Sequence, residues 1–153
     1  MSPRSYAETV RLRRRAAGFT QRELAHQAGV KQPLIAAIER GVRQPSDTVR
    51  AALDEALQLR PSELLSVVRA DVLDAAARVG ATDVRVFGSV ALGTDEPGSD
   101  LDLLVAFPPD ADIVTLLGLE EHLTDLLTVP VDVVSAGSSG PVLARALAEA
   151  VPL

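Results

Sequence analysis

The chain has 153 residues and no cysteine, which excludes a disulfide framework, a thiolate nucleophile and a Cys-ligated metal site. Its hydrophobic content is 47% but its aromatic content is only 3%, so a core must be built largely from Ala, Leu and Val. The net charge of −6 divides unevenly: residues 1–69 hold 12 Lys and Arg against 7 Asp and Glu, whereas residues 70–153 hold 3 against 14. That division favours two small domains, with phosphate contact in the basic half and cation binding in the acidic half.

The basic half is expected to be entirely helical, because its apolar residues recur at helical spacing and no long alternating stretch occurs. Thr20 and Glu23 form a capping box at the start of the second helix, and Gly29 ends it. Ser46 is expected to cap the fourth helix. The five predicted helices are 6–17, 20–29, 32–40, 47–57 and 61–65.

In the acidic half β-branched residues become frequent after one further helix, predicted at 71–79. Strands are expected at 84–87, 101–107 and 129–134, each bounded by Gly, Pro, Asp or Ser. Amphipathic helices are expected at 113–127 and 141–150. Helices and strands thus alternate along this half.

Two short helices joined by Gly29-Val30-Lys31 fit the pattern of a helix-turn-helix, because Ile35 and Ile38 share one apolar face of the second helix. The opposite face then carries solvent-facing residues, namely Gln32, Pro33, Ala36, Ala37 and Arg40. Small side chains there allow close approach to a groove, and a Gln near the helix start can pair with adenine. The alternative is a five-helix bundle that contacts proteins.

The stretch from Thr20 to Gly41 resembles the helix-turn-helix domains of the Cro and phage-repressor (XRE) family, with a Gln at the start of each helix and an Ile-Glu-x-Gly ending. The likeness extends over residues 6–65 and implies an all-α N-terminal DNA-binding domain, placed at residues 1–66. It implies base contacts from Lys31, Gln32 and Ala36. It implies phosphate contacts from Gln21, Arg40 and Arg43.

Asp100 and Asp102 lie at the start of a predicted strand, where a period of two directs both carboxylates to the same face. Two like charges held that close repel each other unless a cation lies between them. Mg²⁺ is the expected ion, because it prefers one or two carboxylates together with substrate phosphate oxygens.

Gly88-Ser89 ends the preceding strand. A residue without Cβ lets backbone N–H groups approach a phosphate, and the Ser hydroxyl adds a donor. Asp132, in a later strand, can supply a third carboxylate. Such a trio supports two-metal phosphoryl transfer, in which one ion lowers the pKa of the attacking hydroxyl and the other neutralises the leaving pyrophosphate.

Gly-Ser, ten residues, Asp-x-Asp and a later strand Asp together resemble the DNA polymerase β-like nucleotidyltransferase superfamily. Residues 70–153 resemble its minimal nucleotidyltransferases, including the chain end from Ala148. The resemblance implies an α+β C-terminal domain, placed at residues 67–153, with helices packed on a small mixed sheet. It implies catalytic and metal-binding roles for Asp100, Asp102 and Asp132. It implies nucleotide binding by Gly88 and Ser89, two Mg²⁺ ions and ATP as substrate.

Minimal nucleotidyltransferases are often antitoxins encoded beside a HEPN-domain ribonuclease toxin, which they inactivate by transferring AMP from ATP to a toxin tyrosine. The resemblance therefore implies a protein adenylyltransferase whose partners are that toxin, ATP and operator DNA, and which represses its own operon. Homo-oligomers or toxin–antitoxin hetero-oligomers are expected, because small helix-turn-helix proteins commonly bind two-fold operators. The chain shows no signal core and no apolar run near the ~20 residues of a membrane span, so we expect a cytoplasmic protein.

The loop between Ser89 and Asp100 departs from the family pattern. Relatives commonly carry Arg there, whereas residues 90–99 contain no Lys or Arg. The acidic half has three cations elsewhere, Arg78, Arg85 and Arg145, and the sequence does not show whether any faces the site. One alternative is a DNA-binding transcription regulator whose inactive nucleotidyltransferase fold serves as a nucleotide sensor or toxin-docking domain. Another, adenylyl transfer to a small molecule, is disfavoured by the short chain.

Overall fold

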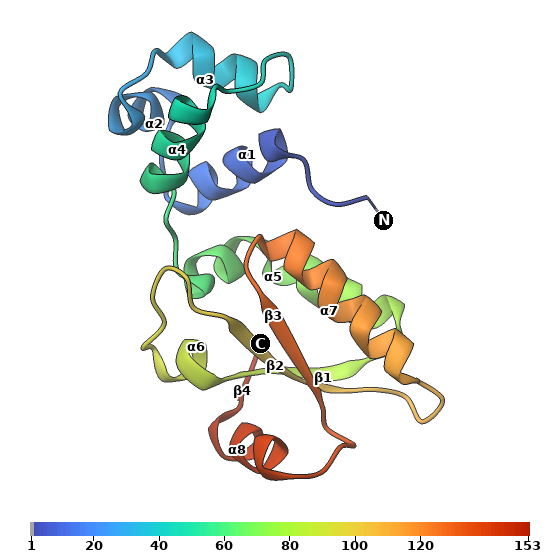
Figure 1. The fold of residues 1–153 in the computed structure, drawn as a ribbon. Coiled ribbons are helices and arrows are strands. Elements are labelled where there is room, and N and C mark those ends of the chain that lie inside the picture. Colours follow the sequence, from blue (N-terminus) through green and yellow to red (C-terminus); the bar gives the residue numbers. More distant parts are fainter. Residues whose placement is uncertain (1) are drawn as a thin grey trace. The chain divides into compact units, whose positions relative to one another are not determined.

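The structure is a computed structural model that describes residues 2–153, so Met1, the first residue of the expected DNA-binding domain, lies outside the described residues. The chain divides into two compact units, residues 2–59 and residues 60–153. The first unit is helical, and the second combines helices with a four-stranded sheet (Figure 1). The predicted all-α plus α+β organisation is confirmed.

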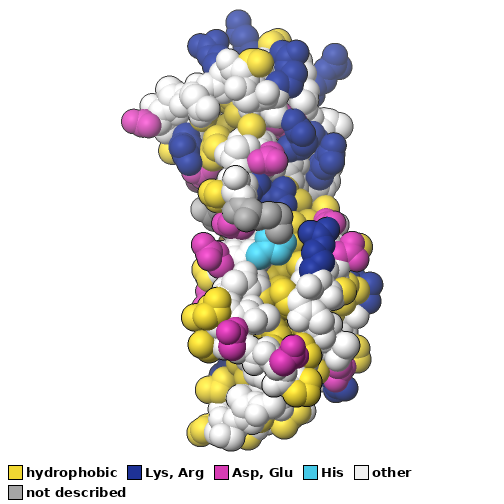
Figure 2. Space-filling view, turned by 90° about the vertical axis from the view of Figure 1, so that its right-hand side faces the viewer, with side chains coloured by type: hydrophobic (Ala, Val, Ile, Leu, Met, Phe, Trp, Pro, Cys, Tyr) yellow, Lys and Arg dark blue, Asp and Glu magenta, His cyan; other side chains and the backbone are white. Residues whose placement is uncertain are grey.

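The two units carry opposite charge. Residues 2–59 hold 10 Lys and Arg against 6 Asp and Glu, whereas residues 60–153 hold 5 against 15. Figure 2 shows Lys and Arg side chains gathered over the helical unit. The basic and acidic halves of the sequence therefore correspond to the helical unit and to the unit with the sheet.

Three of the four helices described in the helical unit begin with a side-chain cap, and the third helix does not. Thr20 accepts a hydrogen bond from the Glu23 N–H, and the Glu23 carboxylate accepts one from the Thr20 N–H, which confirms the predicted capping box. Gly29 ends the second helix with φ +68°, a conformation that favours glycine. The helices described in this unit are α1 Tyr6–Ala16, α2 Gln21–Ala28, α3 Gln32–Glu39 and α4 Asp47–Ala56.

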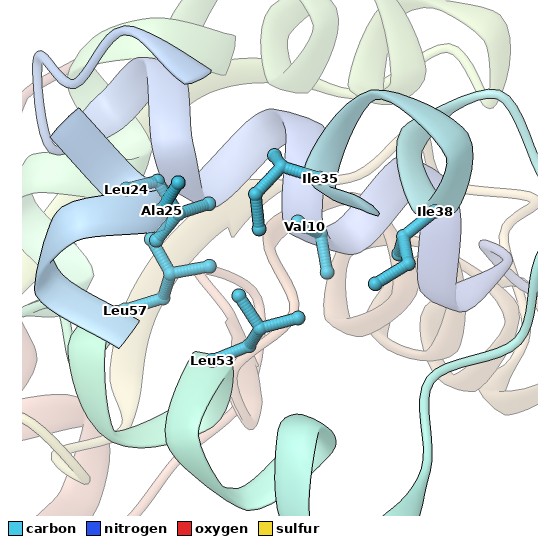
Figure 3. Packing of buried hydrophobic residues seen from close by; sticks show 7 residues of the cluster. All are labelled: Val10, Leu24, Ala25, Ile35, Ile38, Leu53 and Leu57. Atoms are coloured by element: carbon cyan, nitrogen blue, oxygen red, sulfur yellow. The ribbon is translucent and has the colours of Figure 1, made fainter. Parts of the chain in front are cut away.

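All four of these helices contribute to one apolar core (Figure 3). Ile35 and Ile38 of α3 are 0% and 1% exposed, so the apolar face predicted for this helix is confirmed. Full burial of such a side chain contributes about 1.5–3 kcal/mol. The buried members of the core are Val10, Leu24, Ala25, Ile35, Ile38, Leu53 and Leu57.

The second unit begins with α5, Pro61–Arg78, which is one helical element with a kink at Val68 (φ −109°, ψ 15°). The predicted break between helices 61–65 and 71–79 agrees with this kink, although helical residues extend closer to it than predicted. Val68 is buried, and no Pro or Gly lies between Leu65 and Asp71. The unit's other helices are α6 Gly88–Leu92, α7 Ile113–Leu127 and α8 Pro141–Glu149. Within residues 2–153, no helix combines the length and the hydrophobicity needed to cross a membrane.

The sheet has the order β3-β2-β1-β4, with β2 and β3 parallel and the other neighbours antiparallel. Its strands are β1 Thr82–Phe87, β2 Leu101–Ala106, β3 Val131–Ser135 and β4 Val151–Pro152. The predicted small mixed sheet is confirmed, but β4 was not predicted. It is two residues long and ends in Pro152, which a sheet accommodates only at its edge.

The two faces of the sheet are covered differently. α5 and α7 pack together on one face, and α8 lies on the other (Figure 1). Leu104 of β2 and Phe87 of β1 pack with Ala146 of α8 in one buried cluster. Because side chains alternate along a strand, Asp102 shares the face of Leu104. The candidate carboxylates therefore lie on the α8 side.

Candidate functional site

Asp102 and Asp132 lie on neighbouring parallel strands, where they are partners in register. Both therefore project from the same face of the sheet. Asp100 is exposed directly before β2 and, two residues from Asp102, precedes it on the same side. The fold thus gathers the three carboxylates that the sequence singled out.

These carboxylates act on one another electrostatically. Burial raises the pKa of Asp102 above its ordinary value, and the charge of Asp132 raises it further. Arg145 lowers this pKa, while Asp100 and Glu149 raise it by smaller amounts. The charged form of Asp102 is therefore disfavoured in the free protein, and a bound cation would favour it.

The donors fit a magnesium ion held partly by substrate. Among residues 2–153, no three His, Asp or Glu side chains are placed together to hold a metal ion. Mg²⁺ commonly takes only one or two carboxylates and completes its shell with water and phosphate oxygens. The adjacent Asp102 and Asp132, with Asp100 nearby, provide oxygen donors of that kind.

Gly88 packs directly against this cluster. Its φ is +68°, and a Cβ built on it would lie 2.3 Å from Asp102 Oδ2, so no other residue fits without movement. Its backbone N–H donates to Glu149 Oε2 over 3.0 Å. The turn before the partly buried Ser89 is thus held between two carboxylates. The contact with Asp102 is a reason for glycine that the sequence analysis did not identify.

The loop that leads from α6 to β2 is anchored by Asp95, which is 4% exposed. Its Oδ2 accepts a hydrogen bond from the Ser62 N–H over 2.9 Å, at the first turn of α5. The positive end of the helix dipole favours a carboxylate at this position. This loop, which delivers Asp100 to the site, is therefore fastened to the fold at its middle.

Arg145 is the cation that faces the site. Its guanidinium carbon lies 5.7 Å from the ring centroid of Phe87, the residue before Gly88. Arg85 instead forms an exposed ion pair with Asp83, with an Nε–Oδ1 distance of 2.9 Å. Arg78 borders a groove between α5 and α7, on the opposite face of the sheet.

Glu120 of α7 lies beside the free edge of β3. Its Oε2 accepts a hydrogen bond from the Val133 N–H over 2.9 Å. Burial raises the pKa of Asp132, and the charges of Asp100 and Glu120 raise it further. Glu120 thus satisfies an edge-strand donor and adds negative charge beside the site. Sequence analysis missed both Glu120 and Glu149, because each acts through a long-range contact.

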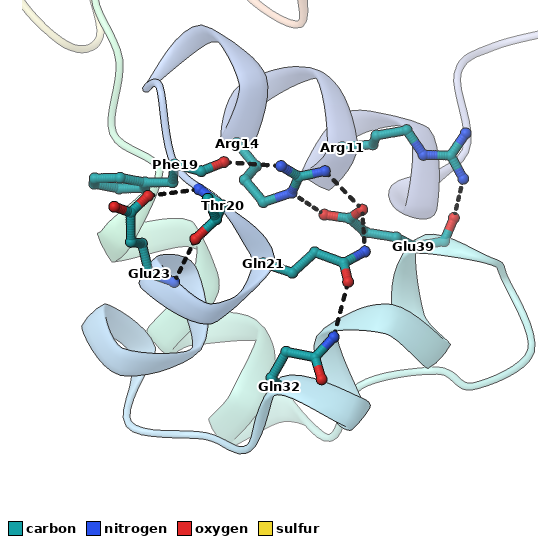
Figure 4. Close-up of polar contacts among 8 residues, drawn as sticks. All are labelled: Arg11, Arg14, Phe19, Thr20, Gln21, Glu23, Gln32 and Glu39. Carbon is teal, nitrogen blue, oxygen red and sulfur yellow. Dashed lines mark hydrogen bonds and ion pairs between the residues drawn. The ribbon is translucent and has the colours of Figure 1, made fainter.

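In the helical unit, a hydrogen-bonded chain fixes the start of α3 (Figure 4). Gln32 Nε2 donates to Gln21 Oε1 over 2.9 Å, and Gln21 Nε2 donates to Glu39 Oε2 over 3.1 Å. Glu39 is 3% exposed and is ion-paired with Arg14. Arg11 also donates to the Glu39 carbonyl oxygen. Gln32 is thereby held in one orientation, with an amide oxygen and a second N–H left for a base edge.

The other predicted contact residues lie on or next to α3 and reach the surface. Lys31 and Arg43 are exposed and border one shallow hollow together with Pro33 and Ala37. Arg40 is exposed, and Ala36 is partly exposed on α3. Cations therefore flank the exposed face of α3, which is the arrangement required for phosphate contact beside base contact.

The mixed sheet, the Gly-Ser turn and the paired strand carboxylates define a nucleotidyltransferase domain. The chain matches the nucleotidyltransferase domain family over residues 70–152, more than half of its length, and belongs to that family. Residues 10–64 match a helix-turn-helix family. The protein is therefore a nucleotidyltransferase joined to a helix-turn-helix unit of the XRE type.

Relatives of the acidic half include the protein adenylyltransferase MntA of Thermococcus cleftensis, which is 34% identical over 76 residues, covering 50% of this chain and 77% of that protein. A solved structure described as a minimal nucleotidyltransferase is 45% identical, with a TM-score of 0.53, and the match covers 60% of this chain and 95% of that one. A toxin–antitoxin crystal structure with AMP-PNP is 22% identical, with a TM-score of 0.50, over 54% of this chain and 69% of that one. At that identity it supports the fold alone.

Proposed function

We propose that this protein is an antitoxin that transfers AMP from ATP to a tyrosine of a HEPN-type toxin, in a Mg²⁺-dependent reaction, and represses its own operon through the helix-turn-helix. The observation that carries this proposal is the pairing of Asp102 with Asp132 against Gly88. It occurs in a chain related to a named protein adenylyltransferase.

Each carboxylate has a distinct place in this proposal. Asp102 and Asp132, together with Asp100, would hold up to two Mg²⁺ ions. Bound Mg²⁺ would supply the charge that activates the tyrosine hydroxyl and neutralises the leaving pyrophosphate. Gly88 and Ser89 would receive the phosphates of ATP next to Asp102, because the glycine lets the turn approach that carboxylate.

The DNA-binding part of the proposal rests on the exposed face of α3. Gln32, with Lys31 and Ala36, would contact bases. Gln21, Arg40 and Arg43 would contact phosphates. Operators of this kind are commonly two-fold symmetric, so the DNA-bound form would be a homo-oligomer or a toxin–antitoxin assembly.

Transfer can be tested with the purified chain, Mg²⁺, labelled ATP and the HEPN-type protein encoded beside it. The toxin should become labelled on tyrosine, and the double variant Asp100→Ala/Asp102→Ala should lose this labelling. A matched control is Asp71→Ala/Asp74→Ala, which removes two exposed carboxylates from α5. Absence of label with the wild type, or label that survives loss of Asp100 and Asp102, defeats the proposal.

The lack of Lys and Arg in residues 90–99 favours one competing function, an inactive fold that senses nucleotide or docks the toxin. In that case ATP or toxin would alter operator binding without any turnover of ATP. Operator binding measured with and without ATP, alongside labelling of the toxin, separates the two functions.

A further inference from the structure

The nucleotide site needs a cation that its own loop does not provide. ATP carries several negative charges, and residues 90–99 contribute none of the Lys or Arg that would balance them. Asp100, Asp102 and Asp132 add further negative charge beside the Gly-Ser turn. Bound Mg²⁺ would balance part of this charge, and a basic side chain from another element beside the turn would balance more of it.

Helix α8 is the element that reaches the turn. Ala146 is 0% exposed and packs on Phe87 and Leu104, so the helix is seated firmly on the sheet. Arg145 precedes Ala146 and places its guanidinium 5.7 Å from the Phe87 ring centroid. Phe87 is followed directly by Gly88, so the guanidinium lies beside the start of the turn.

Arg145 is also available for a ligand. It is exposed, and within residues 2–153 it forms no ion pair, whereas Arg85 is paired with Asp83. Arg145 is attracted to Asp102 but forms no direct ion pair with it, so its fork of N–H donors can reach phosphate oxygens.

Glu149 follows Arg145 by one helical turn, on the same face of α8. Its carboxylate accepts the Gly88 N–H over 3.0 Å. The end of α8 is fastened to β1, because Val151 pairs with Val86 and the Leu153 N–H donates to the Val84 carbonyl oxygen over 3.1 Å. Glu149 thus connects a fixed helix end to the Gly-Ser turn.

Building on the proposed function, we propose that α8 completes the nucleotide site. Arg145 binds the polyphosphate of ATP in place of the missing loop arginine, and Glu149 is a positioning residue that holds the Gly88-Ser89 turn through the Gly88 N–H. The site is therefore built from three segments, which contain the Gly88–Asp102 stretch, Asp132 and α8.

Binding of Mg-ATP to the full chain, measured by calorimetry, tests the role of Arg145. Arg145→Ala should weaken binding about tenfold, because a charge-assisted hydrogen bond contributes about that factor. Arg145→Lys keeps the charge and should recover part of the loss. Arg85→Ala, which removes a paired cation from β1, should bind as the wild type does.

Glu149 is tested by steady-state transfer to the toxin. Glu149→Ala removes the acceptor for the Gly88 N–H and should lower kcat about tenfold. Glu149→Gln keeps an acceptor oxygen and should restore kcat, which a purely electrostatic role would not allow. A thermal unfolding midpoint close to that of the wild type shows that each variant is folded.

The outcomes separate this inference from the proposed function. If the wild type labels the toxin but Arg145→Ala binds ATP as well as Arg85→Ala does, the role of α8 is overturned and the proposed function stands. Equal kcat for Glu149→Ala and the wild type overturns the positioning role. If the wild type binds no ATP and labels no toxin, both proposals fail.

Discussion

Replacing Gly88 with alanine should strain the backbone at this position and displace the Asp102 carboxylate. The residue has φ +68°, where an L side chain costs about 1–2 kcal/mol. The new Cβ would lie 2.3 Å from Asp102 Oδ2, so the carboxylate must leave its rotamer at a further cost of about 0.5–1.5 kcal/mol. The expected loss of unfolding free energy is about 1.5–3.5 kcal/mol, a fall in melting temperature of roughly 10 °C or more for a domain of this size.

Gly93→Ala is the matched control for the backbone. Gly93 has φ +71°, and a Cβ built on it would meet nothing within 4 Å. This variant therefore carries the conformational cost alone, about 1–2 kcal/mol. The difference between the two alanine variants isolates the contact with Asp102.

Calorimetry of the full chain measures the unfolding free energy of both variants. Combining Gly88→Ala with Asp102→Ala removes the contacting carboxylate and should return part of the lost stability. Equal losses at Gly88 and Gly93, or no recovery in the double variant, would refute the idea that Gly88 is required by its contact with Asp102.

Three further outcomes are expected. Gln32→Ala should relax base preference, whereas Arg43→Ala should weaken binding to all sequences and reduce the salt slope by about one in gel-shift titrations; salt-independent binding by the wild type would point to protein contacts instead. Glu39→Ala removes the buried charge and acceptor oxygens that pair with Arg14 and should cost residues 2–59 about 3 kcal/mol in calorimetry, and a loss below about 1 kcal/mol would show that the pair is dispensable. Because the pKa of Asp102 is raised in the folded state, stability decreases as pH rises from the unfolded pKa of about 3.9 to the folded value. With a chelator present, Asp102→Asn should therefore raise the melting temperature at pH 7 but not at a pH below the unfolded pKa. An unchanged melting temperature at pH 7 would contradict the repulsion between Asp102 and its neighbouring carboxylates.

The helical unit could be predicted closely, because its signals are local. The Thr20–Glu23 capping box and the left-handed Gly29 bracket α2 with interactions only a few residues long. α7 likewise begins and ends as predicted at Ile113 and Leu127. A break between Leu65 and Asp71 was predicted from the change in apolar pattern, but its exact position at Val68 was not, because no Pro or Gly marks it.

Long-range pairing limited the prediction of the second unit. β4 consists of Val151 and Pro152, which show no strand pattern by themselves and pair only because α8 returns the chain to the edge of β1. The short helix α6 at Gly88 was likewise not predicted. Five residues are too few for a detectable apolar period.

In the candidate site, too, local patterns could be predicted from the sequence, whereas long-range contacts could not. Motif spacing pointed to Asp100, Asp102 and Asp132, and their grouping follows from strand periodicity and the parallel register. The contact between Glu149 and Gly88 joins residues 61 positions apart, so no local pattern indicates it. The helix at 141–150 and the cation Arg145 were identified from the sequence, but their position beside the Gly-Ser turn was not.

The negative charges around Asp102 lower the stability of residues 60–153 in the absence of a bound cation. Asp102 and Asp132 are both held where burial and mutual repulsion raise their pKa values. Glu120 and Glu149 accept backbone N–H groups that a glutamine could equally satisfy, yet as carboxylates they increase that repulsion. A domain built for stability alone would gain from neutral amides at these positions. The charges of Asp102 and Asp132 are useful when a cation occupies the cluster, so neutral substitutions of these two residues should stabilise the free domain and reduce transfer.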